Sequence, residues 1–324
     1  MTRKAILLAA VLVMTAVFAA TATAATLNEL LGYKPDQKLL IINADDAGMC
    51  HSANMAVIDA MENGVVTGAT IMVPCPWFPE IAQYAREHSD RDFGVHLTHT
   101  SEWGKYRWGP VAGKAAVPGL VDTQGYLWED DEPMWAHATP DEAEREARAQ
   151  LDRALAFGID VTHFDSHMGA MQLNPAYLER YIKLAAEYDL PLRAGPRAMM
   201  ASMPDLGTLL KRAREAGVVF PDDLSYGRRK ENEPVDVYWK RVLRSLEPGV
   251  TELYIHPNVA TPESKAITGT WDERDAEYRL FTTDPEMRQI IKDQGIVLIH
   301  YRQLRDLQRS LRKTGAPPPD LRLP

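Results

Sequence analysis

The sequence predicts an α/β protein built as a single (β/α) barrel, a distorted or incomplete version of the TIM barrel, with long loops at the carboxyl ends of its strands. Two observations predict this fold. Short β-branched or apolar runs alternate with helix-like stretches along most of the 324 residues, and such alternation is typical of parallel strands joined by right-handed crossovers. About eight runs on a chain of this length favour one barrel over two domains.

The expected strands are the runs 39–43, 65–73, 93–97, 160–164, 190–193, 217–220, 251–256 and 295–300. The helix over 140–157 has the clearest ends, because Thr139 can cap it, Glu142 completes a capping box and Gly158 ends it. Other helices are expected near 51–62, 78–88, 174–188, 234–246, 285–294 and 302–312. The connections 98–138 and 257–283 exceed the ~15 residues above which structureless loops are usually functional.

Residues 1–24 have the layout of a secretory signal. Arg3 and Lys4 precede an apolar run, and small residues with an A-x-A site at Ala22-Thr23-Ala24 follow it. The alternative is a membrane anchor, but the run is shorter than the ~20 residues that a spanning helix needs. We expect cleavage, no remaining membrane anchor, and a periplasmic or extracellular location. A lead-in over 25–38, the barrel domain over 39–312 and a Pro-rich tail over 313–324 would follow.

The composition excludes several classes of protein. Hydrophobic residues make up 45% and charged residues 25% of the chain, as in soluble globular proteins and unlike disordered or collagen-like ones. The formal net charge is −9, which argues against nucleic-acid binding. Cys50 and Cys75 could form a bridge in an exported protein, although a chain this long can fold without one. A homodimer is compatible with the sequence.

Titratable residues gather where the expected strands end. Five of the nine histidines do so, together with three aspartates and an arginine; the group comprises Asp45, Asp46, His96, His163, Asp165, His167, Arg193, His256 and His300. In a parallel barrel all these ends open onto one face, where active sites are built. Histidine and aspartate together suit a divalent ion, and three protein ligands leave a position for water. The alternative for Asp45-Asp46 is a turn or a cap of the following helix.

Five motifs in order resemble the YdjC-like carbohydrate deacetylases, whose best-described branch is the chitooligosaccharide deacetylase type. They are N-A-D-D-x-G at 43–48, N-G-x-x-T-G at 63–68, G-x-H-L-T at 94–98, T-H-x-D-S-H at 162–167 and the pair His256-Pro257. The resemblance covers roughly 39–305 and implies a distorted (β/α) barrel. Two departures would reshape the pocket: Ala47 stands where the family usually has Phe, and Met168-Gly169 stand where it usually has further histidines.

By this resemblance, Asp46, His96 and His167 would bind one divalent metal ion. Asp45 would be the general base, and His256, cationic before the step, would protonate the leaving amine. Ligand softness favours Zn²⁺, whereas the family is generally described as using Mg²⁺.

The roles of the other site residues rest on their positions. Arg193 would keep Asp45 ionised, or form an ordinary salt bridge at the barrel mouth. Asp165 would orient a ligand histidine, and His163 would be structural or support the ligands from behind. Trp103 and Trp108 belong to a group of six loop tryptophans that would either stack on sugar rings or build small satellite cores.

The expected function is therefore the metal-dependent hydrolysis of an N-acetyl group from an amino-sugar-containing oligosaccharide or glycan. Metal-activated water would attack, with an aspartate base and a histidine acid. One alternative is an exported, non-catalytic sugar-binding protein on the same scaffold. Another is a metal-dependent hydrolase or isomerase of a different small molecule.

Overall fold

A computed structural model describes residues 25–225 and 229–316, and it has the expected α/β architecture with a curled, incompletely closed parallel sheet. The predicted signal at 1–24 and residues 317–324 of the predicted tail lie outside the described residues. Within the described ranges, no helix combines the length and the apolar character needed to cross a membrane.

Every strand pairing in the sheet is parallel, in the order β4-β3-β2-β1-β6-β5, with β7 beside the amino-terminal half of β1. The strands are β1 (Lys38–Ala47), β2 (Gly68–Ile71), β3 (Phe93–Leu97), β4 (Val161–Ser166), β5 (Asp223–Ser225), β6 (Gly249–Ile255) and β7 (Ile296–Leu298). Because all strands run the same way, their carboxyl ends meet at one edge of the sheet.

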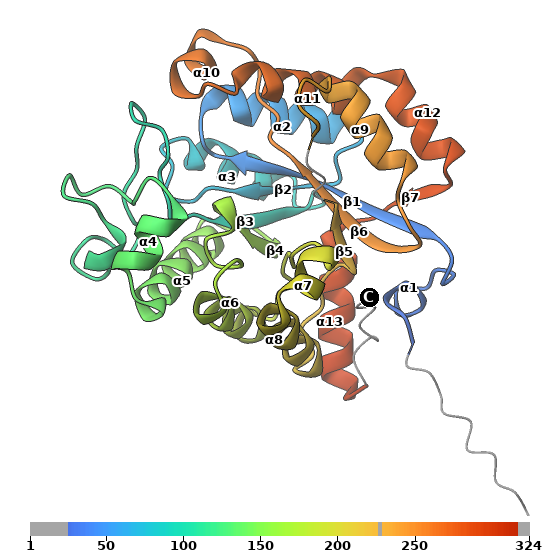
Figure 1. Cartoon of the computed structure of the whole chain (residues 1–324), viewed down its shortest axis with the longest axis horizontal. Coiled ribbons are helices and arrows are strands. Elements are labelled where there is room, and N and C mark those ends of the chain that lie inside the picture. Colours follow the sequence, from blue (N-terminus) through green and yellow to red (C-terminus); the bar gives the residue numbers. More distant parts are fainter. Residues whose placement is uncertain (1–24, 226–228, 317–324) are drawn as a thin grey trace, which may run out of the picture.

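Helices cover both sides of this sheet, with α2, α9, α11 and α12 above it and α5, α6, α8 and α13 below it in Figure 1. Their bounds are α1 (Leu27–Leu30), α2 (His51–Asn63), α3 (Phe78–Glu87), α4 (Asp131–His137), α5 (Pro140–Ala156), α6 (Pro175–Tyr188), α7 (Arg197–Ser202), α8 (Pro204–Glu215), α9 (Val235–Arg244), α10 (Pro262–Ile267), α11 (Trp271–Thr283), α12 (Pro285–Asp293) and α13 (Tyr301–Thr314). The seven predicted helices are confirmed to within two residues at each end. The capping box of α5 is present, since Thr139 and Glu142 bond each other's backbone N–H.

Two strand predictions, 190–193 and 217–220, are wrong. These segments are extended and bridge the gap between β4 and β5, but Leu192 forms a single bridge to Phe164 and donates to Val219 O at 3.4 Å. Pro191 and Pro221 lie in or next to these segments, and proline has no N–H to donate to a ladder. A short strand forms instead just beyond, as β5.

Strand β1 separates two hydrophobic cores by its alternation. Leu40 and Ile42 point into the large core, whereas Leu39 and Ile41 point into a smaller one that packs against α13. This period of two is what an extended strand imposes on its side chains. With both faces buried, β1 is held rigidly, and the residues at its carboxyl end are held with it.

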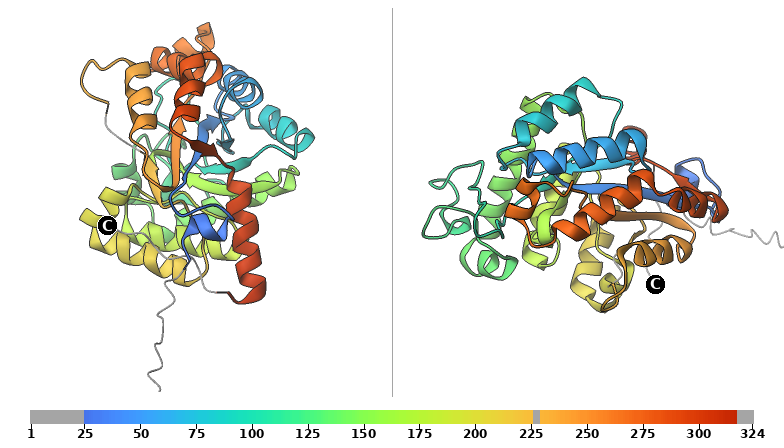
Figure 2. Two further views of the ribbon diagram at one scale, coloured as in Figure 1. Left: turned by 90° about the vertical axis from the view of Figure 1, so that its right-hand side faces the viewer. Right: turned by 90° about the horizontal axis from the view of Figure 1, so that it is seen from above.

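Both long connections contain structure that was not predicted. The first, 98–138, includes α4, and Glu146 of α5 anchors it by accepting hydrogen bonds from Val111 N and Ala112 N, both at 2.8 Å. The second, 257–283, contains α10 and α11. Both cysteines are buried free thiols. In the right-hand view of Figure 2, the first connection projects from the left-hand end of the molecule.

Candidate active site

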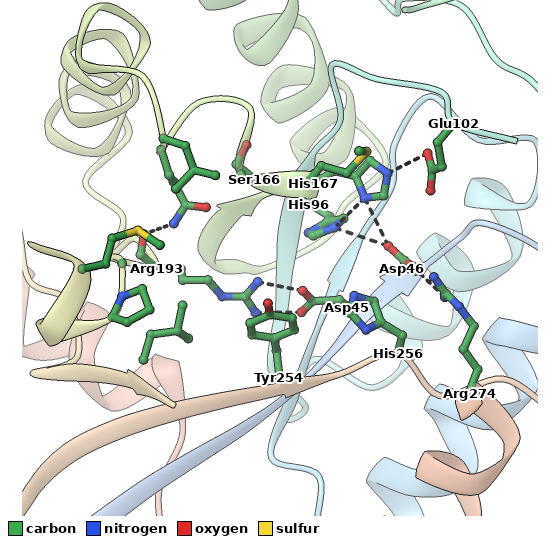
Figure 3. Close-up of a pocket in the computed structure, with 18 residues that line it drawn as sticks. Asp45, Asp46, His96, Glu102, Ser166, His167, Arg193, Tyr254, His256 and Arg274 are labelled. Atoms are coloured by element: carbon green, nitrogen blue, oxygen red, sulfur yellow. Dashed lines mark hydrogen bonds and ion pairs between the residues drawn. The ribbon is translucent and has the colours of Figure 1, made fainter. Parts of the chain in front are cut away.

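A cavity of about 330 Å³ lies at the carboxyl edge of the sheet. Its polar side carries most of the residues predicted for the site (Figure 3), and an apolar wall faces them. The lining residues used below are Asp45, Asp46, His96, Glu102, Ser166, His167, Met168, Leu173, Arg193, Pro196, Met199, Leu224, Tyr254, His256 and Arg274.

Both members of the Asp45-Asp46 pair line this cavity, although neighbouring strand residues normally point to opposite faces. The pairing of β1 with β2 shifts register between Ala44 and Ala47, and Asp46 has a positive φ of 65°. A bulge at a strand end re-aims side chains in this way. A left-handed backbone at a residue other than glycine costs energy of order 1–3 kcal/mol and is found at functional sites.

Three side-chain atoms form a small triangle at one end of the cavity. Asp46 Oδ1 lies 3.4 Å from both His96 Nε2 and His167 Nδ1, and these two nitrogens are 3.1 Å apart. All three side chains are at most 5% exposed. They come from β1, β3 and the turn after β4, so the sheet itself sets their spacing. This is one of the groups of residues that could hold a metal ion; Asp45, His96 and Asp165 form another.

A second carboxylate binds the far nitrogen of each histidine. His96 Nδ1 lies 2.6 Å from Asp165 Oδ1, and His167 Nε2 lies 3.0 Å from Glu102 Oε2. In a neutral imidazole, a ring N–H that donates to a carboxylate leaves the other ring nitrogen with a free lone pair. These contacts therefore direct both lone pairs into the triangle, as in carboxylate–histidine–metal sites.

The electrostatics of the triangle favour a positive charge. Asp46 Oδ1 is buried and, within the described residues, has no hydrogen-bond partner apart from its 3.4 Å contacts with the two imidazoles; a cation would satisfy this oxygen. Burial would lower the pKa of His96, but Asp165 raises it to about 9; likewise Glu102 outweighs burial and raises the pKa of His167 well above its ordinary value. The donor set and this field fit a divalent metal ion.

Arg193 donates a bidentate pair of hydrogen bonds to Asp45, and each terminal nitrogen lies 2.7 Å from one carboxylate oxygen. It also contacts Asp165 and Glu252 at 2.8 Å, and its guanidinium lies over the Tyr254 ring. Burial alone would raise the pKa of Asp45, but Arg193 holds it well below the ordinary value. Asp45 is thus ionised and fixed in orientation. Arg193 keeps it so from a buried position, which differs from an ordinary salt bridge at the barrel mouth.

His256 follows β6 and lines the cavity, but the expectation that it is cationic does not fit its surroundings. Burial in the cavity and the nearby Arg274 guanidinium together lower the pKa of His256 to about 4, against the opposing effect of Asp46. The imidazole is therefore neutral at pH 7. Glu277 of α11 fixes the backbone here by accepting from His256 N at 2.8 Å.

Four other histidines and tryptophans lie outside the cavity. His163 stacks on Tyr301 at 3.8 Å between ring centroids, and Gly94 leaves room for it, because a Cβ there would meet the imidazole at 2.7 Å. His300 binds Thr67 O, just before β2 begins. Trp108 is 3% exposed and donates to Thr100 O, and Trp103 packs on its edge. Among the described residues no tryptophan lines the cavity, which fits satellite cores rather than sugar stacking.

Sequence reasoning missed three cavity residues: Glu102, Tyr254 and Arg274. Arg274 on α11 donates to Asp46 Oδ2 at 2.7 Å and so turns Oδ1 toward the histidines. Glu102 and Arg274 lie in the two long connections, whose length alone indicated function. Tyr254 lies two residues before His256, on the same face of the strand, and that spacing is the signal that could have found it.

Comparisons with known proteins agree with this arrangement. The YdjC-like protein family matches residues 39–293. A carbohydrate deacetylase from Thermoanaerobacter pseudethanolicus is 31% identical over 264 residues, covering 82% of this chain and 98% of the relative. A chitooligosaccharide deacetylase from Yersinia enterocolitica is 34% identical over 167 residues, covering 48% of this chain and 59% of the relative.

The fold has a solved counterpart in a putative cellobiose-phosphate cleavage protein from Enterococcus faecalis. That structure superposes with a TM-score of 0.70 at 29% identity, covering 83% of this chain and 99% of that one. The family match spans the strands and helices that carry all three triangle residues. The chain belongs to the YdjC-like protein family.

Proposed function

We propose that this protein is a carbohydrate deacetylase that hydrolyses the N-acetyl group of an amino sugar with the help of one divalent metal ion. The single observation that carries the proposal is the triangle of Asp46 Oδ1, His96 Nε2 and His167 Nδ1, in which each imidazole has a carboxylate behind it. The names of the curated relatives, carbohydrate deacetylases, agree with this chemistry.

The ion that best suits the triangle is zinc. With ligand bonds of 2.0–2.1 Å, a tetrahedral centre spaces its ligand atoms by about 3.3 Å, whereas an octahedral centre such as magnesium spaces adjacent ligands by about 2.9 Å. The edges of 3.1–3.4 Å lie nearer the tetrahedral value, and two nitrogens with one oxygen suit zinc in softness. When bound, such an ion lowers the pKa of water and polarises a carbonyl.

The chain's own residues would manage the protons. Asp45, fixed by Arg193, presents Oδ2 with only one side occupied by Nη1, and it can accept a proton from water at that atom. Its depressed pKa makes it a weak base, so its contribution is orientation and charge more than basicity. His256 begins neutral, so the proton it delivers to the departing nitrogen must be one it takes up within the same turnover.

Two variants separate the roles of the aspartates. Asp46→Asn should lose metal, because it removes the charge of a proposed ligand. Asp45→Asn should keep metal and lose turnover. The assay is acetate release from N-acetylated chitooligosaccharides, with and without chelator, beside metal analysis of protein purified without added ions. Full activity in Asp45→Asn would show that its assignment as base is wrong.

The same assay tests the alternatives. Sugar binding without acetate release, unaffected by chelator, would favour a non-catalytic binding protein; the intact set of charged residues in the cavity argues against it. Export rests on the pattern of residues 1–24, and we propose a periplasmic or extracellular location on that basis. An N-terminus that begins near Ala25 in protein recovered outside the cytoplasm would support it.

A further inference from the structure

We propose that the cavity accepts N-acyl groups longer than acetyl, with the acyl chain lying along its apolar wall. This inference rests on the proposed amide hydrolysis and names the substrate class more closely: amino sugars that carry a short fatty acyl chain on nitrogen. The wall consists of Met168, Leu173, Pro196, Met199 and Leu224 and is called the acyl wall below.

The acyl wall exposes more apolar surface than a methyl group could cover. Met168 and Leu173 are 40% and 37% exposed, among the most exposed large apolar side chains of the described chain, and both line the cavity. Leu173 and Met199 also line a second, internal space of about 20 Å³ whose remaining walls include Leu178, Leu206 and Leu210. The apolar surface therefore continues inward beyond the main cavity.

The acyl wall lies on the side of the reacting groups where the acyl chain of a bound amide would extend. The triangle comes from β1, β3 and the turn after β4, the proposed base from β1, and His256 from the end of β6. A carbonyl carbon between these groups has its oxygen toward the triangle and its nitrogen toward His256. The acyl substituent then points to the remaining side, the gap between β4 and β5, and the acyl wall lines that gap.

Polar groups that could bind sugar hydroxyls lie on the other side of the cavity. Glu102 and Arg274 come from the two long connections, and Figure 3 shows both beyond the triangle, away from Arg193. A hydroxylated ring against the acyl wall would leave its polar groups without partners, which is costly. An aliphatic chain has no such groups and gains about fourfold in affinity for each methylene it buries.

The test compares N-acetyl-, N-butyryl- and N-hexanoylglucosamine as substrates of the metal-loaded full-length protein, with amine release as the readout. We expect kcat/KM to rise from acetyl to butyryl, by up to about fifteenfold for two buried methylenes. Leu173→Gln should lower the butyryl-to-acetyl ratio. Leu155→Gln is the matched control, since Leu155 is 46% exposed on α5 and does not line the cavity; it should leave the ratio unchanged.

Turnover of the acetyl substrate with a lower kcat/KM for the longer chains would overturn this inference and leave the proposed function intact. It would mean that the wall contacts the C–H face of a sugar ring instead. Hydrolysis of none of the three amides, together with no acetate release from N-acetylated chitooligosaccharides, would overturn the proposed function and this inference with it. Calorimetry of the free acids gives a reading without turnover: hexanoate should bind more tightly than acetate, and Leu173→Gln should remove the difference. Equal affinities would contradict the acyl wall.

Discussion

Replacing Glu102 with glutamine should weaken metal binding without removing a ligand. Glu102 Oε2 lies 3.0 Å from His167 Nε2, and its side chain is 23% exposed. Burial would raise its pKa, but His167 lowers it, so Glu102 is charged at neutral pH. A hydrogen bond to a charged group contributes about 1.5–3 kcal/mol, and partial exposure places this one in the lower half of that range. The expected loss is roughly 10–45-fold in metal affinity, within the range known for such partners of metal ligands.

The assay is a zinc titration of metal-free protein against a competing chelator, followed by the same titration on Glu102→Gln. Glu129→Gln is the control, because Glu129 lies exposed in the same connection and loses an equal charge. Folding of each variant is checked by its denaturation midpoint. An unchanged zinc affinity in Glu102→Gln, or an equal loss in Glu129→Gln, would refute the claim that Glu102 orients His167.

Other expectations concern stability and order. Arg193→Lys should lower the free energy of unfolding by about 2–4 kcal/mol, because one ammonium cannot satisfy the three buried carboxylates that Arg193 contacts. Urea denaturation measures this change. As the control, Arg212→Lys, which alters an exposed ion pair with an N–O distance of 3.9 Å, should change the free energy of unfolding by less than about 0.5 kcal/mol. Burial lowers the pKa of His99 from 6.5 to about 4. As pH drops from 6.5 to 4, His99 is therefore protonated in the unfolded chain but not in the folded one, and the free energy of unfolding falls. His99→Gln keeps a donor for Ala143 O and should flatten this loss, whereas His137→Gln, on an exposed residue, should not; equal pH profiles would exclude His99 as the cause. Glu146→Ala should release Val111 and Ala112 and speed proteolysis within 98–138, and an unchanged cleavage pattern would show that the connection is anchored elsewhere.

Much of the fold was predictable because local signals agree with the tertiary structure. The capping box of α5 and the apolar run of β1 each correspond to an element that forms where it was expected. The failures have local causes too. The segments around Leu192 and Val219 have strand-like composition, yet prolines interrupt their ladders. Helix α11 was missed because its apolar periodicity is weak: eight of its thirteen residues are charged or threonine.

The candidate site was predictable only as far as it follows strand ends. Motif order placed Asp46, His96 and His167 near one another, and the sheet brings them within 3.4 Å. Glu102 and Arg274 come from connections whose path no strand or helix signal determines. The neutral state of His256 depends on burial and on Arg274, neither of which can be read from a His-Pro pair. The location of the site could therefore be predicted from the sequence, but the protonation states and orientations that side-chain partners determine could not.

The charge balance of the cavity indicates how the site and its substrate must match. Four carboxylates, those of Asp45, Asp46, Glu102 and Asp165, surround the triangle, and two guanidinium groups, those of Arg193 and Arg274, offset half of them. Burial raises the pKa of the neighbouring Glu252 to about 7, so it adds at most part of a charge. With His96 and His167 neutral, as histidines are when they bind a metal, two negative charges remain, and one divalent cation would neutralise them. A neutralised site offers no surplus positive charge to an anionic substrate, and the chain as a whole carries −9, which repels polyanions. The charge balance therefore favours an uncharged substrate, such as the proposed N-acyl amino sugar, over an anionic one. In the proposed binding mode, the acyl wall holds the apolar acyl chain of that substrate.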